Sequence, residues 1–185
     1  MTPRQRRVVT IAAIVWWLVI LALLPFGRAI VDALRSRSLL VLCTTAGFGA
    51  VMVLLAVGGV LLRRAALVEP TQWLFALMMS AVVIVLVQLL PRAEERWHVV
   101  QYGILGVLCW AAVPSDKRWR VAWAVLLVGS MGWIDEGIQL LLPNRVYDWL
   151  DVMLNAGSGL AGAGIPALSG RLASTRGAAR SAEVR

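Results

Sequence analysis

Six long apolar segments constrain how this chain can fold more than any other feature of its sequence. They are Val8–Leu24, Leu39–Leu62, Trp73–Leu90, Val99–Val113, Val121–Leu142 and Val152–Leu168. A helix needs about 20 residues to cross the hydrocarbon core of a bilayer. The chain is 60% hydrophobic and only 15% charged, whereas soluble domains carry about 25% charged residues. We therefore expect an all-α, polytopic transmembrane helical bundle of about six spans.

The first and fourth segments need separate comment. A basic stretch precedes the first segment, so it resembles a signal peptide, and the bundle would then have five spans. Its apolar run is too long for a signal peptide and no small-residue cleavage site follows, which favours a true span. The fourth segment reaches spanning length only if its helix begins near Glu94 or Glu95.

The basic residues predict the orientation of the spans. Twelve Lys and Arg lie on one side: Arg4, Arg6, Arg7, Arg63, Arg64, Lys117, Arg118, Arg120, Arg171, Arg176, Arg180 and Arg185. Six lie on the other, in the first, third and fifth loops: Arg28, Arg35, Arg37, Arg92, Arg96 and Arg145. Cytoplasmic loops carry the excess of positive charge. We therefore expect an integral protein of the bacterial cytoplasmic membrane with both termini in the cytoplasm, whose charge of +8 serves lipid headgroups and not nucleic acid.

The chain divides by composition into three parts. Residues 1–90 hold three spans without a recognisable motif, and residues 91–168 hold three spans with polar residues inside them. Residues 169–185 are rich in Ala, Ser, Gly and Arg, which predicts a basic, mobile tail. Cys43 and Cys109 lie in apolar runs without a CxxC pattern, so we expect both to be small core residues.

Polar residues inside the last three spans share helical faces. His98, Gln101, Tyr102 and Leu105 follow the spacing of one face of the fourth span, near its outer end. Asp135 and Glu136 lie in the outer third of the fifth span, with Gln139 one turn further on. A carboxylate at this depth costs about 2.5–3.5 kcal/mol on insertion scales and is a functional candidate for that reason.

The sixth span begins with Asp148, Asp151 and Asn155 on one face. Ser158, Gly159 and Gly162 continue that face and, being small, allow a neighbouring helix to approach closely. Three helix ends are therefore predicted to bring their polar faces together on the extracytoplasmic side.

Several interpretations of this predicted cluster remain open. It is a structural network in which Arg145 pairs with Asp135, Glu136 or Asp151, or it is a functional site. The candidates for catalysis are His98, Asp135, Glu136 and Asp151, and those for ligand binding are Tyr102, Gln139, Arg145, Asp148 and Asn155. These residues suit a divalent metal, a general base or an anion held by Arg145. No HExxH, P-loop or GxSxG motif is present, so the sequence identifies neither a metal nor another cofactor.

Three ordered motifs in this region resemble the VanZ-like family of small bacterial membrane proteins. The first is Glu95-Arg96-Trp97-His98 followed by Tyr102-Gly103 and Leu105-Gly106. The second is Asp135-Glu136-x-x-Gln139 followed by Pro143-x-Arg145. The third is Asp148-x-x-Asp151-Val152 followed by Asn155 and Gly159.

The resemblance implies a cell-envelope role, because the family is named for a protein linked to low-level teicoplanin resistance. We expect a protein that binds a membrane lipid or a lipid-bearing ligand at its extracytoplasmic polar site and modulates susceptibility to teicoplanin-like glycopeptides. One alternative is a membrane-embedded hydrolase or transferase, with or without a metal, that acts on a phosphorylated or esterified lipid. Another is a small transporter with a proton-coupled carboxylate pair.

Overall fold

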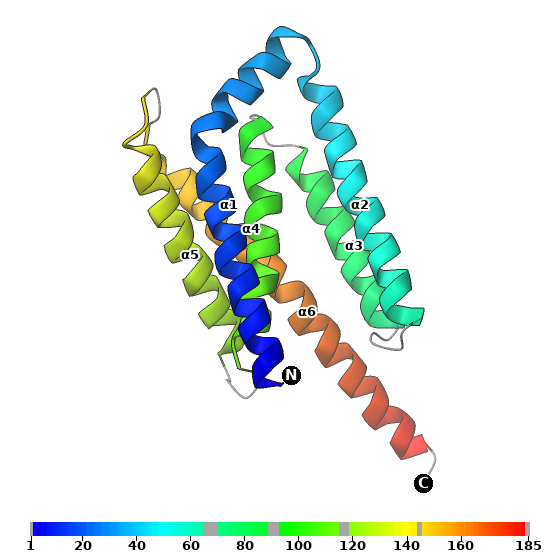
Figure 1. The fold of residues 1–185 in the computed structure, drawn as a ribbon. Coiled ribbons are helices and arrows are strands. Elements are labelled where there is room, and N and C mark those ends of the chain that lie inside the picture. The colour runs from blue at the N-terminus through cyan, green and yellow to red at the C-terminus, as the bar shows by residue number, and fades with distance from the viewer. Residues whose placement is uncertain (1, 65–69, 89–92, 115–118, 144–145, 184–185) are drawn as a thin grey trace. The chain divides into compact units, whose positions relative to one another are not determined.

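In a computed structural model, which describes residues 2–64, 70–88, 93–114, 119–143 and 146–183, the chain forms helices connected by short segments (Figure 1). The described residues contain no strand. The helices are α1 (Pro3–Ser36), α2 (Leu40–Arg64), α3 (Pro70–Val87), α4 (Ala93–Ala112), α5 (Arg120–Gln139) and α6 (Trp149–Glu183). The expected all-helical fold is confirmed for the described residues, and α4 begins at Ala93, close to the helix start expected near Glu94 or Glu95.

The chain divides into two compact units. The first comprises Met1–Leu40 and Leu90–Ala163, and the second comprises Val41–Leu89 and Gly164–Arg185. The first unit therefore contains α1, α4, α5 and the beginning of α6. All the candidate site residues fall within this unit, so its internal packing determines the geometry of the site.

Helix α1 begins with a capping box. The Thr2 hydroxyl accepts a hydrogen bond from the Gln5 backbone N–H at 3.2 Å, and the Gln5 side chain accepts from the Thr2 backbone N–H at 2.8 Å. Pro3 occupies the first helical turn, where the missing N–H costs nothing. The N-terminus of α1 is therefore defined by local contacts alone.

Helix α1 also extends beyond the predicted span, through Pro25 to Ser36. The prediction that Arg28 and Arg35 lie in a loop was wrong, because both are helical. An exposed Asp32–Arg35 pair, 3.9 Å apart, has the i,i+3 spacing that supports a helix in its polar last turns. Ser38, with φ at 57°, then adopts the left-handed conformation that follows many helix ends.

The core of the first unit contains side chains from all four of its helices. Its buried members are Ala13, Ile20, Tyr102, Leu105, Cys109, Ala124, Val128 and Ala163. A hydrogen bond of 2.9 Å from the Trp16 indole N–H to the Gln101 carbonyl oxygen joins α1 to α4. The burial of Cys109 matches the prediction, whereas Cys43 is exposed, so the prediction of a core position for Cys43 was wrong.

Glycines bring α4 and α6 into backbone contact. A Cβ added to Gly162 would overlap the Gly103 carbonyl oxygen and lie 2.9 Å from its carbon. A Cβ added to Gly106 would overlap the Gly159 carbonyl oxygen and lie 2.9 Å from the Gly159 Cα. The close helix approach expected from the small residues of α6 is therefore confirmed, and it fixes how deeply α6 sits against α4.

Large apolar side chains are exposed on α1 and α5, whereas several polar side chains are fully buried beside the apolar core. Ile11 and Leu126 are each 60% exposed, while Asp135, Glu136 and Asn155 are 0% exposed. Helices α1 and α5 are long and apolar enough to cross a membrane, a test of length and composition that some soluble core helices and signal sequences also pass. Leu40–Val51 and Ala76–Val85 are shorter apolar stretches.

Helix α6 continues through Pro166 to Glu183. The residues from Ser169 onwards, where the sequence shows no apolar periodicity, thus belong to this helix. Ala and Arg have high intrinsic helix propensity, and a helix that is polar on all sides needs no apolar stripe in its sequence.

Candidate functional site

A buried cluster of polar side chains lies between α4, α5 and α6. Helix α4 contributes His98 and Tyr102, which are one turn apart. Helix α5 contributes Asp135, Glu136 and Gln139, and the start of α6 contributes Asp148 and Asn155. Hydrogen bonds and one imidazole–amide contact join these residues across the three helices. The predicted meeting of three polar helix faces is confirmed. The individual roles assigned to these residues stay predictions.

The first centre of the cluster is the Asp135 carboxylate. The Tyr102 hydroxyl donates to Asp135 Oδ2 at 2.6 Å, and the Gln139 amide N–H donates to Asp135 Oδ1 at 3.5 Å. Asp135 and Tyr102 are both 0% exposed. A distance of 2.5–2.7 Å is typical of a hydroxyl that donates to an ionised carboxylate, which is among the stronger hydrogen bonds in proteins. Tyr102 therefore stabilises a charge that would be costly in this apolar setting.

The second centre is the Glu136 carboxylate. The Gln139 amide N–H donates to Glu136 Oε1 at 2.7 Å, and the Asp148 backbone N–H donates to Glu136 Oε2 at 3.4 Å. The amide of Gln139 thus serves both buried carboxylates. Because Asp148 precedes α6, its bond to Glu136 also joins the start of α6 to the end of α5.

His98 and Asn155 form the third part of the cluster. His98 Nδ1 lies 3.3 Å from Asn155 Oδ1, and the His98 ring stacks on Tyr102 with centroids 6.0 Å apart and planes inclined by 11°. An Asn155 oxygen that accepts from Nδ1 would place the ring proton on Nδ1 and the lone pair on Nε2, which is the tautomer in which Nε2 can accept a hydrogen bond from a ligand.

Asn155 itself has an unpaired donor. Its Nδ2 is buried and has no hydrogen-bond partner among the described residues. Gly132 makes room for this side chain, since a Cβ at Gly132 would lie 2.8 Å from the Asn155 Cβ. A buried amide N–H without an acceptor costs roughly 1–3 kcal/mol, so this position favours an incoming group with an acceptor oxygen.

The remaining candidates lie at the start of α6 or outside the described residues. Asp148 caps α6, since its Oδ1 accepts from the Leu150 backbone N–H at 2.9 Å. Asp151 is half-buried in the first turn of the same helix. Arg145, and with it each ion pair that it was predicted to make, lies outside the described residues.

The structure bears on metal binding only within the residues it describes. Among these, no three His, Cys, Asp or Glu side chains are placed to hold one metal ion. The carboxylates of Asp135 and Glu136 accept hydrogen bonds from the hydroxyl, amide and backbone N–H donors given above.

The contribution of α1 and of Gly132 was missed from the sequence. Trp16 binds the Gln101 carbonyl and so holds α1 beside the helix that carries His98 and Tyr102. Nothing in the local sequence of α1 predicts this contact, since an indole within an apolar run can also pack without a partner on a neighbouring helix. Gly132 belongs to no motif in the sequence. Only its position opposite Asn155 shows that it makes room for the Asn155 side chain.

Replacing Tyr102 by Phe tests the Asp135 contact. We expect Tyr102→Phe to lower the free energy of unfolding by about 1.5–3 kcal/mol, because the buried Asp135 carboxyl group loses a hydrogen-bond donor at 2.6 Å. Thermal or denaturant unfolding in detergent measures this change. Tyr147→Phe is the matched control, since the Tyr147 hydroxyl is buried without a partner among the described residues and its loss costs little. Equal effects of the two substitutions would contradict a stabilising role for the Tyr102 hydroxyl.

The fold and the site together define a helical protein with apolar outward faces and a hydrogen-bonded polar cluster inside one of its two units. No protein-family model, curated protein or solved structure matches this chain.

Proposed function

We propose that this chain is a six-span integral protein of the bacterial cytoplasmic membrane whose polar cluster binds the polar part of a lipid or of a lipid-bearing ligand. The observation that carries the proposal is the unpaired buried donor of Asn155 within a cluster enclosed by apolar helices. A ligand that supplies an acceptor oxygen to Asn155 and a donor to His98 Nε2 would complete the hydrogen bonding there.

The distribution of side chains supports a membrane setting. In water, exposed apolar side chains as numerous as those of α1 and α5 would favour aggregation, whereas in a bilayer they contact acyl chains. In a bilayer, the exposed apolar faces of the helices are stabilised by contact with lipid. The carboxylates lie inside the bundle, where hydrogen-bond donors satisfy them.

The distribution of charge supports an extracytoplasmic cluster. Arg120 donates to carbonyl oxygens at the C-terminal end of α4, and His98 lies near the other end of that helix. Twelve residues separate His98 from Trp110, or about 18 Å along the helix axis. Under the positive-inside rule, the end with Arg120 faces the cytoplasm and the polar cluster faces outward.

The VanZ-like resemblance suggests the ligand class. The motif residues His98, Tyr102, Asp135, Glu136, Gln139 and Asn155 are the ones that form the cluster. We infer that the cluster binds a lipid or a lipid-linked envelope precursor. This binding would limit how readily lipid-bearing glycopeptides such as teicoplanin reach the envelope.

Drug susceptibility of a sensitive host tests this function. We expect wild type to raise the inhibitory concentration of teicoplanin but not that of vancomycin, which lacks the lipid chain. Both His98→Ala and Glu136→Gln should abolish the protection at matched membrane levels. Ser158→Ala is the control, because the Ser158 hydroxyl donates only to the Leu154 carbonyl of its own helix. No protection by wild type, or full protection by both variants, would refute the proposed role.

A second candidate is a membrane-embedded hydrolase or transferase that acts on a phosphorylated or esterified lipid. The His98–Asn155 contact favours it, because a neutral imidazole with a free Nε2 is suited to general-base catalysis. Purified protein would then form product steadily from a lipid panel, and His98→Ala would lose that turnover. Ligand binding without turnover would leave only the binding role.

A further inference from the structure

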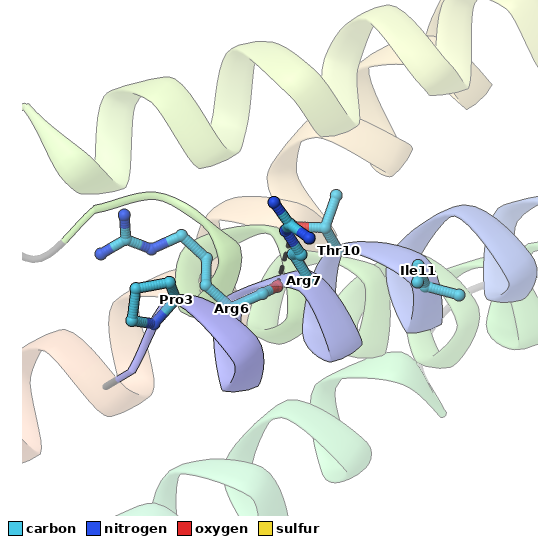
Figure 2. A pocket seen from close by; sticks show the side chains of 5 residues that line it. All are labelled: Pro3, Arg6, Arg7, Thr10 and Ile11. Carbon is cyan, nitrogen blue, oxygen red and sulfur yellow. Dashed lines mark hydrogen bonds between the residues drawn. The ribbon is translucent and has the colours of Figure 1, made fainter.

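A second polar feature lies at the N-terminal end of α1, away from the polar cluster. A surface hollow of about 410 Å³ is lined there by Pro3, Arg6, Arg7, Thr10 and Ile11. Figure 2 shows both guanidinium groups extending from the first turns of α1, with the Thr10 hydroxyl bonded to the Arg6 carbonyl oxygen. The hollow is thus lined by two cationic side chains, a hydroxyl and apolar side chains.

The positive charge at this hollow is not balanced by the contacts that the structure records. Arg6 Nε is buried without a hydrogen-bond partner, and neither Arg6 nor Arg7 forms an ion pair with a described residue. Arg6 also lies near enough to Arg120 for the two cations to repel each other. An anion in the hollow would pair with the outer guanidinium N–H groups of Arg6 and Arg7 and reduce this repulsion.

Arg120 is held in a fixed position at the same end of the unit. Its Nε donates to the Trp110 carbonyl oxygen at 2.8 Å and a terminal nitrogen donates to the Ala111 carbonyl oxygen at 3.4 Å. The centre of its guanidinium group lies 3.8 Å from the centroid of the Trp110 ring. Because the contacts of Arg120 are already made within the protein, Arg6 and Arg7 are the groups left to bind an anion.

The surroundings of the hollow indicate the kind of anion. A guanidinium group presents paired N–H donors that match two oxygens of a phosphate. Val8 and Ile11 are each 60% exposed on the same stretch of α1, which suits the glycerol and upper acyl carbons of a lipid better than a freely soluble ion. Basic residues beside a span attract anionic lipid headgroups at about 1 kcal/mol each.

We propose that the hollow formed by Arg6, Arg7, Pro3, Thr10 and Ile11 binds the phosphate of an anionic phospholipid. The lipid would anchor the N-terminal end of α1 at the membrane surface and compensate the charge that Arg6 and Arg120 place close together. This site is distinct from the polar cluster and does not depend on which ligand that cluster binds.

Retention of phosphatidylglycerol tests the proposal. The full chain would be transferred from nanodiscs that contain phosphatidylglycerol and phosphatidylcholine into detergent, and the lipids that stay bound would be counted by native mass spectrometry. We expect wild type to retain phosphatidylglycerol selectively. Two arginines at about 1 kcal/mol each correspond to roughly a 30-fold loss of that preference in the Arg6→Gln/Arg7→Gln double variant.

Arg4→Gln is the matched control, because it removes the same charge from the same helical turn but does not line this hollow. We expect it to change retention by at most about twofold, since Arg4 lies outside the hollow and acts on the bound phosphate only across a distance that salt screens. An equal loss in Arg4→Gln would overturn the proposal in favour of general surface charge. Displacement of the lipid by millimolar inorganic phosphate would overturn the lipid assignment in favour of a soluble anion.

Folding of each variant is checked by its far-ultraviolet circular dichroism. If the double variant does not fold, the single Arg7→Gln variant replaces it, because the Arg7 side chain is exposed and makes no recorded contact. Arg7→Gln should then lose about fivefold in selectivity, and unchanged retention would overturn the proposal.

Discussion

The substitution Gly162→Ala is expected to destabilise the first unit by about 3 kcal/mol or more. A single methyl group at this position would overlap the Gly103 carbonyl oxygen and lie 2.9 Å from its carbon. Both are backbone atoms of α4, so no side-chain rotation relieves the overlap and α6 must move away from α4. Overpacking by one methylene already costs about 1–3 kcal/mol where side chains can adjust. Gly106→Ala should behave similarly against the Gly159 backbone.

The same helix offers controls with the opposite expected sign. A Cβ added to Gly157 or Gly164 meets nothing within 4 Å. Alanine at either position should therefore be neutral or stabilise by about 0.5–1 kcal/mol, because glycine loses more conformational entropy in a helix. Unfolding by sodium dodecyl sulfate or by heat in a mild detergent distinguishes the Gly106→Ala and Gly162→Ala variants from the Gly157→Ala and Gly164→Ala variants. Similar stabilities for all four variants would show that α4 and α6 do not approach each other this closely.

The second large effect is expected for Gln139→Glu, which preserves the shape of the side chain but replaces its amide with a carboxyl group. The Gln139 N–H groups now donate to Asp135 and Glu136. At neutral pH the new carboxylate would accept where a donor is required and would add a buried negative charge beside the carboxyl groups of Asp135 and Glu136. Leaving buried charges without their partner typically costs about 3–5 kcal/mol. We therefore expect poor folding or a loss of stability of that size.

Acidification should partly reverse the effect of Gln139→Glu. Below the pH at which the new carboxyl group takes up a proton, its O–H can again donate to a neighbouring carboxylate. The stability difference from wild type should therefore shrink as pH falls and grow as pH rises. Stability measured across a pH series tests this sign, and a difference that grows on acidification would contradict it.

Gln5→Glu is the control for that substitution. The Gln5 side-chain oxygen accepts a hydrogen bond from the Thr2 backbone N–H in the capping box of α1. A carboxylate accepts equally well there, and glutamate is a common residue at this position of the box. The same change in charge should therefore leave stability nearly unchanged, which assigns the effect at Gln139 to its two buried partners.

The polar faces of the last three helices could be predicted from spacing alone. His98 and Tyr102 lie four residues apart, as do Asp135 and Gln139, and a helix brings such pairs to one side. The expected small-residue contact of α6 also follows from local spacing, since Gly159 and Gly162 leave a groove on one face. These features need no knowledge of the neighbouring helices.

The partner of each residue could not be predicted in this way. Trp16 donates to a carbonyl oxygen 85 positions further along the chain, and Asn155 meets a histidine 57 positions before it. Cys43 and Cys109 lie in similar apolar runs, yet only Cys109 is buried. These contacts and the burial of each cysteine depend on how each helix is rotated about its axis and on which helix packs beside it. An apolar run in the sequence determines neither the rotation nor the neighbour.

The sequence by itself therefore determined the helical class of this protein, the existence of polar faces in its last three helices and their membership of one cluster. These properties follow from hydrophobicity and from the helical repeat, which act locally along the chain. Only the tertiary structure decided that one amide, Gln139, serves two carboxylates, that Asn155 keeps an unpaired donor and that Arg6 lies near Arg120. A hydrogen bond or an electrostatic contact requires atoms from distant segments to meet within a few ångströms, and the packing of the helices alone sets those distances.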